Sequence, residues 1–438
     1  MKKVYVETMG CQMNKSDSER IAGMLSYFGY EECTNPREAD LLIVNTCSIR
    51  QLAAEKAYSQ VGVWGKWKKH KPVKIGFCGC VAQQDKENLL KRFPYIDLVF
   101  GTHNIYELPN LIKRVESGEQ VCSITETPYK TDTTQYQISR KGSLNAWIPI
   151  IEGCNNFCTY CIVPYTRGRE RSRSVEEILN EAKNAIKQGY KEITLLGQNV
   201  DSYGKDFKDN KTTLANLLRE INKLDGKFRV RFVTSYPTDI TEDLIDAVEE
   251  CDKICKYFHI PMQSGNSEIL KKMNRRYDYE QYKEIVEKIR KRFKHVTITS
   301  DFIAGFPGET EEQFQDTLSA IKNLKLDYSN TAAYSPRAKT VAAKWTDKFI
   351  DEQTKKERLE RLNAVNKEAT FESNKRFIGE TLEVLVEEVK EKDGKRIITS
   401  RAGNNKIVHF ESATAQIGDF TSVKIEHASI WCVKGKEI

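Results

Sequence analysis

The sequence Ala146-Trp-Ile-Pro-Ile-Ile151-Glu-Gly-Cys154-Asn-Asn-Phe-Cys158-Thr-Tyr-Cys161 decides the fold of the central part of the chain. Residues 146–151 form a short apolar run that predicts a buried strand, and three cysteines follow in the next loop. In a barrel of alternating strands and helices, such a loop lies on the face that carries active sites. Three closely spaced thiolates can bind three irons of a cubane cluster and leave the fourth open. A zinc knuckle completed by a distant histidine is the alternative.

Further strands and helices alternate on the carboxyl side of this loop. Amphipathic stretches such as 174–188 and 279–292 separate the strands, and a charged helix is predicted at 351–374. The predicted strands are 146–151, 192–196, 228–234, 256–262, 295–302 and 326–334. This order predicts an α/β fold in which residues 144–373 form an open or partial (β/α)6 barrel.

The amino-terminal part also alternates strands with helical segments, which predicts a parallel sheet with helices on both faces. Its predicted strands are 3–8, 41–45, 73–77 and 97–100. We therefore expect residues 1–118 to form a three-layer α/β domain. Residues 119–143 are rich in threonine and weakly apolar, and they predict a linker.

The carboxyl-terminal part changes to short alternating strands with Gly and Asn-Asn at the turns. The strands are predicted at 381–389, 395–400, 406–411 and 421–426. Residues 374–438 are thus expected to form a small antiparallel β-barrel.

The composition describes a globular chain of 438 residues, with 39% hydrophobic and 30% charged residues and a net charge of +7. This mild basicity permits a nucleic-acid partner without requiring one. No apolar run is long enough for a bilayer crossing, and the first residues predict a strand and not a signal peptide. We expect a soluble, cytoplasmic protein that has no membrane partner.

Twelve cysteines in such a chain favour metal or redox chemistry over disulfides. Cys11, Cys47 and Cys80 each come just after a predicted parallel strand. Because the carboxyl ends of parallel strands share one edge of a sheet, these thiols can converge into a second three-thiolate site. Cys78 competes with Cys80 for this role. Five cysteines are interpreted as packing residues: Cys33, Cys122, Cys251, Cys255 and Cys432, with Cys251 and Cys255 placed on one helix.

The Cys-x3-Cys-x2-Cys loop in a (β/α)6 series resembles the radical S-adenosylmethionine (SAM) superfamily, with Tyr160 before the last cysteine. The resemblance implies a cluster at Cys154, Cys158 and Cys161 whose open iron binds SAM. It also implies cofactor contacts after the later strands. These candidate residues are Tyr160, Gly197, Gln198, Asn199, Ser235, His259, Gln263, Asp301 and Gly305.

Over nearly its full length the chain is similar to the methylthiotransferase family of that superfamily. The family has an auxiliary [4Fe-4S] cluster in its first domain and a carboxyl-terminal β-barrel called TRAM. Gly-Cys-Val-Ala at residues 79–82 matches its pattern and favours Cys80 over Cys78. Gly10-Cys11-Gln-Met-Asn14, followed by Asp17-Ser-Glu19, resembles the branch that acts on isopentenyladenosine in tRNA. Branches acting on threonylcarbamoyladenosine or on a ribosomal-protein aspartate are the alternatives.

The resemblance implies two [4Fe-4S] clusters and two uses of SAM, one as methyl donor and one as radical source. Its implied product carries a methylthio group on carbon 2 of isopentenyladenosine at position 37 of the tRNA anticodon loop. It also implies an electron donor, such as flavodoxin or ferredoxin, and a sulfur source. A hypothesis of a different class is a non-catalytic iron–sulfur or zinc RNA-binding protein.

Clusters of basic residues are the candidate tRNA contacts, because phosphates are bound by grouped cations. The predicted contacts are Arg167, Arg169, Arg171, Arg173 and Arg337. Residues 66–71 and 290–294 are further basic stretches, and the second of these is interpreted as a solvated helix face. Arg337 is followed by Ala338-Lys339-Thr340 where the family has Arg-x-Gly-Thr, so a positive φ angle there would strain Lys339.

Overall fold

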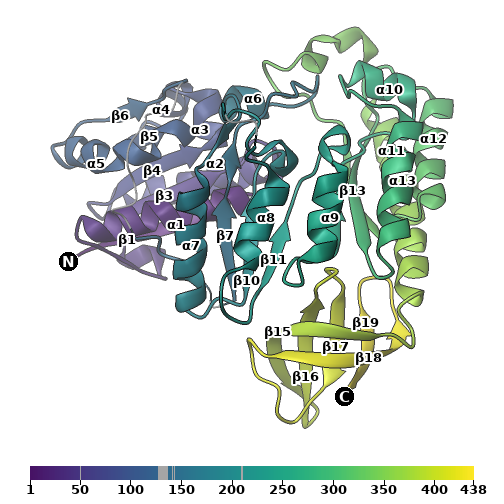
Figure 1. Ribbon diagram of the computed structural model, residues 1–438. Coiled ribbons are helices and arrows are strands. Elements are labelled where there is room, and N and C mark those ends of the chain that lie inside the picture. Colours follow the sequence, from purple (N-terminus) through teal and green to yellow (C-terminus); the bar gives the residue numbers. More distant parts are fainter. Residues whose placement is uncertain (50, 127–136, 141, 143, 209–210) are drawn as a thin grey trace. The chain divides into compact units, whose positions relative to one another are not determined.

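The computed structural model describes the whole chain except residues 50, 127–136, 141, 143 and 209–210 (Figure 1). Its contacts divide the chain into two compact units. The first unit contains residues 1–142, 152–155 and 161–171, and the second contains residues 143–151, 156–160 and 172–438. Of the predicted linker at 119–143, residues 127–136, 141 and 143 lie outside the described part, and residues 121–123 form a strand of the first unit.

The first unit is built on six parallel strands in the order β2-β1-β3-β4-β5-β6 (Figure 1). The strands are β1 (Lys2–Met9), β2 (Tyr30–Glu32), β3 (Leu41–Thr46), β4 (Lys74–Gly79), β5 (Leu98–Phe100) and β6 (Val121–Ser123). The two outermost strands, β2 and β6, were not predicted.

Helices cover both faces of this sheet, which confirms the three-layer prediction. They are α1 (Gln12–Tyr27), α2 (Gln51–Trp67), α3 (Cys80–Asp85), α4 (Asn88–Arg92) and α5 (Leu108–Glu116). On one face, Ile21 of α1 and Leu111 of α5 belong to one buried cluster with β-strand residues. On the other face, Trp64 of α2 and Val81 of α3 belong to a second cluster.

The second unit contains the half-barrel that the alternating pattern predicts (Figure 1). Two parallel three-stranded sheets, β7-β10-β11 and β12-β13-β14, make up its inner wall. The N–H of Ser235 donates to the carbonyl of His259 at 2.8 Å and joins the two sheets. The strands are β7 (Asn145–Pro149), β10 (Glu192–Leu196), β11 (Arg229–Phe232), β12 (Tyr257–His259), β13 (Thr297–Ala304) and β14 (Tyr328–Ala333).

The helices of the half-barrel alternate with its strands in the sequence. They are α7 (Val175–Lys187), α8 (Leu214–Asn222), α9 (Glu242–Glu250), α10 (Ser267–Lys272), α11 (Tyr279–Arg292), α12 (Glu311–Asn323) and α13 (Glu352–Lys375). Three short elements surround the cysteine loop: β8 (Ile151–Glu152), α6 (Val163–Thr166) and β9 (Arg171–Ser172). Among the described residues, no helix has both the length and the apolar character to cross a bilayer.

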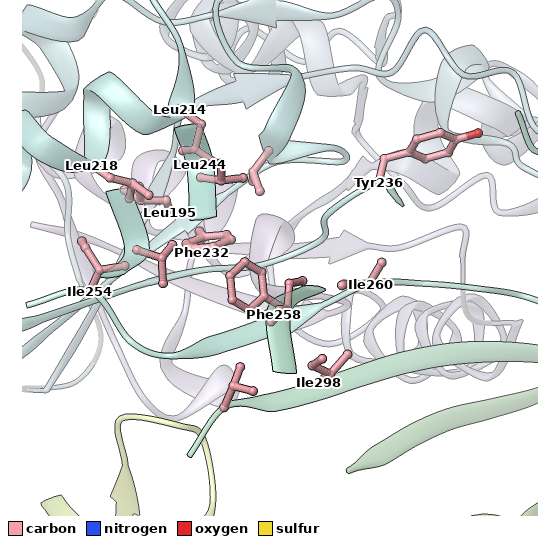
Figure 2. Packing of buried hydrophobic residues seen from close by; sticks show 14 of the residues in the cluster. Leu195, Leu214, Leu218, Phe232, Tyr236, Leu244, Ile254, Phe258, Ile260 and Ile298 are labelled. Carbon is pink, nitrogen blue, oxygen red and sulfur yellow. The ribbon is translucent and has the colours of Figure 1, made fainter. Parts of the chain in front are cut away.

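One continuous apolar core lies between these strands and helices (Figure 2). Phe232 of β11 and Phe258 of β12 meet edge to face at 5.6 Å between ring centroids, and Ile298 of β13 extends the same layer. Leu214 and Leu218 of α8 cover it from outside the sheet. This packing fixes the ends of neighbouring strands, from which the candidate site is built.

The carboxyl-terminal strands close into a five-stranded barrel in the order β15-β16-β17-β19-β18. They are β15 (Thr381–Lys392), β16 (Lys395–Ala402), β17 (Ile407–Glu411), β18 (Phe420–Ala428) and β19 (Val433–Glu437). The small barrel is confirmed, with two differences. The last strand, β19, was not predicted, and it pairs parallel with β17, so the barrel is not purely antiparallel.

The predicted helical placement of Cys251 and Cys255 is wrong. Helix α9 ends at Glu250, and Cys251 is already in an extended conformation. Both cysteines are nevertheless buried, each with 4% of its surface exposed. Their interpretation as packing residues agrees with this burial.

Candidate functional site

Three cysteines of the first unit lie at the carboxyl ends of adjacent strands. Cys11 follows β1 and is the N-cap of α1, Cys47 follows β3, and Cys80 begins α3 directly after β4. In the sheet, β3 lies between β1 and β4, so all three thiols share one edge. Cys11 and Cys47 each shift the pKa of the other, and the charge of Cys80 raises the pKa of Cys47.

The electrostatics of this edge favour a thiolate at Cys11. The hydrogen bond from Cys47 is the largest cause that lowers the pKa of Cys11 to about 5, assisted by the charge of Arg167 and by backbone N–H groups of α1. The same hydrogen bond, with burial, raises the pKa of Cys47. Burial raises the pKa of Cys80, and Arg167 opposes that shift. Thiolates are the form in which cysteines bind metal.

Among the described residues, no three His, Cys, Asp or Glu side chains are grouped closely enough to hold one metal ion. A cubane cluster does not need such a group, because each cysteine binds a different iron. None of the described cysteines is joined in a disulfide. Three cysteines at one edge are a donor set that fits an iron–sulfur cluster.

A hydrogen-bond network between α1 and β3 supports this edge of the sheet. The side-chain oxygen of Asn14 accepts from the backbone N–H of Cys11 at 3.3 Å and also lies 3.3 Å from Cys11 Sγ. Asn14 Nδ2 donates to Asn45 Oδ1 at 3.1 Å, and Asn45 Nδ2 donates to Ser18 Oγ at 3.0 Å. These contacts tie the start of α1 to β3, so the positions of Cys11 and Cys47 are coupled.

Gly79 explains how the chain presents Cys80 and not Cys78. Its φ angle is +90°, and an added Cβ would lie 2.3 Å from Asn45 Oδ1. Glycine therefore allows β4 to turn directly into α3 against the Asn45 network. Cys78 remains on the strand, 1% exposed, in an apolar cluster with Leu98 and Phe100. Cys80 instead lies where the charges of Cys11 and Arg167 act on it.

Arg167 is buried in the first unit, at the end of α6. It is 4% exposed, and its guanidinium donates to Asp17 Oδ2 at 2.5 Å. Burial works against its positive charge, yet Asp17, Cys80 and Cys11 together hold the pKa of Arg167 well above its usual value. The RNA contact predicted for Arg167 is therefore wrong, because a phosphate cannot reach a buried guanidinium already paired with a carboxylate.

The second cysteine set lies in the loop between β8 and α6. Cys154 and Cys161 belong to the first unit, and Cys158 belongs to the second. The backbone N–H of Cys154 donates to the carbonyl of Gly168 at 3.1 Å. At Gly153 φ is +81°, and an added Cβ would lie 2.1 Å from the carbonyl oxygen of Arg169. The close approach of these two backbone segments requires glycine.

In the second unit, the part of this loop around Cys158 is held from two sides. The N–H of Thr159 donates to the carbonyl of Met273 at 3.0 Å, and its carbonyl accepts from Ala342 at 2.8 Å. Arg275 donates to the sulfur of Cys158 at 3.5 Å and to the carbonyl of Pro261 at 2.5 Å. A cation thus lies beside this thiol as well.

The strand ends of the half-barrel carry unusual backbone conformations. Thr234, Gln263 and Gly305 follow β11, β12 and β13, with φ angles of +77°, +77° and +73°. A positive φ in a β-branched residue such as Thr234 is rare, and such strain concentrates at functional sites. The three positions are therefore candidates for ligand contact on structural grounds that the sequence does not show.

Polar groups converge at the same strand ends. Asn199 Nδ2 donates to Asp239 at 2.6 Å, while the buried Oδ1 of Asn199 finds no hydrogen-bond partner among the described residues. Ser235 Oγ donates to the buried Asp201 at 3.1 Å. Burial raises the pKa of Asp201 to about 7, although Ser235 and the N–H of Tyr236 oppose the shift. The free oxygen of Asn199 fits a donor such as an amino group.

His259 and Asp301 form a connected polar pair at the ends of β12 and β13. His259 Nε2 lies 3.3 Å from Asp301 Oδ2, and its Nδ1 lies 2.9 Å from Thr299 Oγ1. Asn330 donates to Asp301 Oδ1 at 2.9 Å. Burial opposes ionisation, but His259 and Asn330 hold the pKa of Asp301 below its usual value. Asp301 is thus a carboxylate at neutral pH.

The remaining predicted cofactor residues lie along the same edge. Gly197 follows β10, and an added Cβ would lie 2.5 Å from Ile151 Cγ2, so glycine is required by packing. Gln198 is partly buried in the turn before Asn199. Tyr160 packs against a small apolar cluster that includes Phe306.

The other predicted RNA contacts differ in exposure. Arg169 is exposed, and Arg171 pairs with Glu152 at 2.9 Å. Arg173 is held by Glu181 and by the carbonyl of Pro149, both at 2.8 Å, which indicates a structural role. Arg337 donates to Ser335 Oγ at 3.2 Å. Lys339 has a φ angle of +76°, so the strain expected for a non-glycine residue there is present.

Two further basic stretches make many contacts within the protein. Lys68 pairs with Asp97 at 2.6 Å, and Lys71 donates to the carbonyl of Ala39 at 2.8 Å. Arg292 pairs with Asp246 and Glu249 on the neighbouring helix α9. These pairs agree with the interpretation of residues 290–294 as a helix face.

Sequence reasoning missed three residues of the candidate site. Asp17 lies in the Asp-Ser-Glu motif, but nothing in the sequence pairs it with Arg167, which is 150 residues away. Arg275 lies 117 residues from Cys158 and follows a short helix without any motif. Asp201 follows the Gly-Gln-Asn turn, and its burial is visible only in three dimensions.

Three family models match successive parts of the chain. They are the radical SAM superfamily (residues 148–321), the family described as Uncharacterized protein family UPF0004 (residues 3–101) and the TRAM domain (residues 372–436). With the half-barrel, the cysteine loop and the terminal barrel, these matches define a radical SAM enzyme with a TRAM domain. A radical SAM enzyme uses an iron–sulfur cluster and SAM.

Full-length relatives then identify the family. A tRNA-2-methylthio-N(6)-dimethylallyladenosine synthase of Acetivibrio thermocellus is 45% identical over 99% of this chain and 91% of the relative. Relatives of the same name from Thermoanaerobacter pseudethanolicus and Clostridium botulinum are 44% and 45% identical over 99% of this chain and 92% and 96% of theirs. The chain belongs to the tRNA-2-methylthio-N(6)-dimethylallyladenosine synthase family.

Solved structures share the fold at low sequence identity. The radical SAM methyltransferase TsrM of Kitasatospora setae, with cobalamin and a [4Fe-4S] cluster bound, is 16% identical with a TM-score of 0.57, covering 78% of this chain and 77% of its own. The cobalamin-dependent radical SAM enzyme OxsB has 13% identity and a TM-score of 0.55, covering 82% of this chain and 56% of its own.

Proposed function

We propose that the protein transfers a methylthio group to carbon 2 of N6-dimethylallyladenosine, also called isopentenyladenosine, in tRNA. The observation that carries this function is the 44–45% identity to synthases of that name over 99% of the chain. The radical SAM and TRAM matches agree with it. The domains proposed for this activity are residues 1–118, a linker at 119–143, residues 144–373 and residues 374–438.

Two [4Fe-4S] clusters are part of the proposal. Cys154, Cys158 and Cys161 would hold the cluster that binds SAM, and the cysteine edge of the first unit would hold the auxiliary cluster. Its ligands would be Cys11, Cys47 and Cys80. The thiolate-forming environment of Cys11 and the buried position of Cys80 next to Arg167 support this second assignment. Cys78 is not proposed as a ligand, because it packs inside the apolar core.

SAM would lie along the strand ends of the half-barrel. The unpartnered oxygen of Asn199 suits the amino group of SAM, and the Asp301 carboxylate, fixed by His259, suits a hydroxyl group of its ribose. Gln263 and Gly305 have positive φ angles, and the N–H of Gln263 donates to the backbone carbonyl of Asp301 at 2.8 Å. Tyr160, Gly197, Gln198 and Ser235 complete the proposed site.

When bound, the clusters and SAM would supply the electron, the deoxyadenosyl radical and the methylated sulfur that the reaction needs. The chain's own residues orient these groups and keep water away. Tyr160 packs against an apolar cluster that includes Phe306, and Arg275 places a positive charge at Cys158. A low-polarity surrounding protects a radical from side reactions.

The tRNA would present its modified adenine as an unstacked base, because a base inside a stacked loop cannot reach a buried site. Arg169, Arg171 and Arg337 remain proposed phosphate contacts. Binding should weaken as salt increases, in proportion to the number of phosphates contacted. An electron donor such as flavodoxin or ferredoxin and a sulfur source are further proposed partners.

Alanine replacement of each cysteine set tests the proposal. Replacing Cys11, Cys47 and Cys80 should abolish methylthiolation of tRNA but leave SAM cleavage to deoxyadenosine. Replacing Cys154, Cys158 and Cys161 should abolish both. The matched control replaces Cys33, Cys122 and Cys432, which should leave the iron content at about eight per chain. One zinc per chain without SAM cleavage would contradict the enzyme assignment and favour a non-catalytic RNA-binding protein.

Nucleoside mass spectrometry of tRNA from a deletion strain identifies the substrate. The proposal expects loss of the methylthio mark on dimethylallyladenosine. If that mark persists while the one on threonylcarbamoyladenosine disappears, the substrate is wrong although the chemistry stands. Loss of a methylthio group on a ribosomal-protein aspartate would indicate the third branch.

A further inference from the structure

Arg167 is a buried cation that the sequence places beside one cysteine set and the fold places beside the other. It follows Cys161 by six residues in the sequence. Its segment is fixed on the first unit, because Thr102 Oγ1 donates to the carbonyl of Thr166 at 2.6 Å and Arg167 N donates to the carbonyl of Val163 at 2.8 Å. The guanidinium is therefore held in one place.

The groups that face this guanidinium are mostly negative. Asp17 is its ion-pair partner at 2.5 Å, with both side chains 5% exposed. The charge of Arg167 also acts on the thiols of Cys80 and Cys11 and lowers the pKa of each. Glu152, paired with Arg171 at 2.9 Å, adds one more carboxylate and one more cation to the surroundings. Asp17 and the two cysteines thus share one buried positive charge.

Such a charge has a direct consequence for an iron–sulfur cluster. Its reduction potential depends on net charge, burial and hydrogen bonds to its sulfur atoms. A fixed cation favours the reduced, more negative state and raises the potential, whereas a fixed anion lowers it. Because the Arg167 environment excludes water, these interactions are less screened than at the surface.

We propose that Arg167 is a positioning residue that sets the reduction potential of the auxiliary cluster, and that Asp17 moderates its effect. The inference rests on the proposed function, since it requires a cluster at Cys11, Cys47 and Cys80. It assigns the arginine after the radical SAM cysteine loop to the chemistry of the other cluster. The Arg167 segment therefore carries a ligand of one cluster and the charge partner of the other.

The test uses a full-length variant in which Cys154, Cys158 and Cys161 are alanine, so that only the auxiliary cluster remains. Its potential is measured by redox titration followed by electron paramagnetic resonance. Arg167→Gln should lower the equilibrium constant for reduction at least tenfold, which is about 59 mV for one electron. Asp17→Asn should shift the potential in the opposite direction. Arg167→Lys keeps the positive charge, so its reduction potential should stay close to that of the parent.

Arg169→Gln is the matched control, because Arg169 is an exposed arginine of the same segment. It should leave the potential unchanged. The inference would be overturned if Arg167→Gln and Asp17→Asn shift the reduction potential in the same direction, or if neither shifts it. A pair with a purely structural role gives no reason for the two substitutions to shift the potential in opposite directions.

Failures of the two proposals are distinguishable. If the variant without Cys154, Cys158 and Cys161 binds no iron, the auxiliary cluster assignment fails. If Arg167→Gln alone loses its iron, retention of iron in Arg167→Lys together with the upward shift in Asp17→Asn still supports the charge role. Loss of iron in Arg167→Lys as well would overturn it and leave Arg167 as a purely structural residue.

Discussion

Single residues at the candidate site act through charge and hydrogen bonding that the fold makes possible. Arg275 is one example: its guanidinium contacts the sulfur of Cys158, the hydroxyl of Tyr277 at 2.6 Å and the carbonyl of Pro261. It also lies 4.5 Å from the ring centroid of Tyr236. One side chain therefore connects the cysteine loop with the end of β12.

Replacement of Arg275 should destabilise the protein measurably. Arg275→Met removes several hydrogen bonds of a charged donor and leaves buried acceptors without a partner, so we expect a loss of about 2 kcal/mol in unfolding free energy. Urea unfolding measures it. Arg276→Met, at the exposed neighbouring position, should stay within about 0.5 kcal/mol of the parent. Equal effects of the two substitutions would contradict the role of Arg275.

Asp201 should make stability depend on pH. Burial raises its pKa from 3.8 to about 7 in the folded protein, so between these values the folded state binds more protons than the unfolded state. The stabilising contribution of protonated Asp201 is fully present below pH 4, and it is lost as the pH rises through 7. The loss is on the order of 4 kcal/mol. Asp201→Asn should flatten this dependence in urea unfolding at pH 5 and pH 8, whereas exposed Asp225→Asn should not.

At the scale of elements, amphipathic helices and buried strands follow from the sequence pattern alone. The pattern of residues 174–188 corresponds to α7, whose capping box joins Ser174 and Glu177. The pattern at 192–196 corresponds to β10 without any shift. Strand β6 lies inside the predicted linker and takes its hydrogen bonds from its neighbour β5, so its place in the sheet depends on tertiary pairing.

The loop after β14 contains a local strain that can be removed. Lys339 is exposed and has a φ angle of +76°, a conformation that costs a non-glycine residue on the order of 1 kcal/mol. Lys339→Gly should therefore raise the unfolding free energy by about 0.5 kcal/mol, because the entropy that glycine loses on folding offsets part of the relieved strain. Lys339→Ala keeps the strain and serves as the control. A gain with alanine equal to that with glycine would show that the side chain, and not the backbone, is responsible.

At the scale of the whole molecule, buried charges of the second unit join the half-barrel to the terminal barrel. Asp327 accepts from Arg376 at 2.5 Å and lies 3.2 Å from Lys406 of the terminal barrel. Burial by itself would raise the pKa of Asp327, but these two cations and Arg290 hold it below its usual value. Arg229 of β11 also donates to the carbonyl of Arg401 at 2.6 Å.

Removing the Asp327 charge should loosen this junction. Asp327→Asn leaves the buried Lys406 and the less buried Arg290 and Arg376 without this countercharge, which costs on the order of 3 kcal/mol. We expect faster proteolytic release of residues 374–438 and a lower unfolding midpoint. Exposed Asp347→Asn is the matched control. Unchanged proteolysis in Asp327→Asn would show that apolar contacts alone hold the barrel.

The sequence by itself determined the three-part architecture, the radical SAM cysteine loop and the candidate cysteines at strand ends. These features are local: periodicity and spacing record which face of an element is buried and which residues follow a strand. Only the tertiary structure decided that Cys78 packs in an apolar cluster with Leu98 and Phe100, and that Arg167 is buried against Asp17. Such pairings join residues far apart in the chain, and their electrostatics depend on burial, which no local pattern encodes.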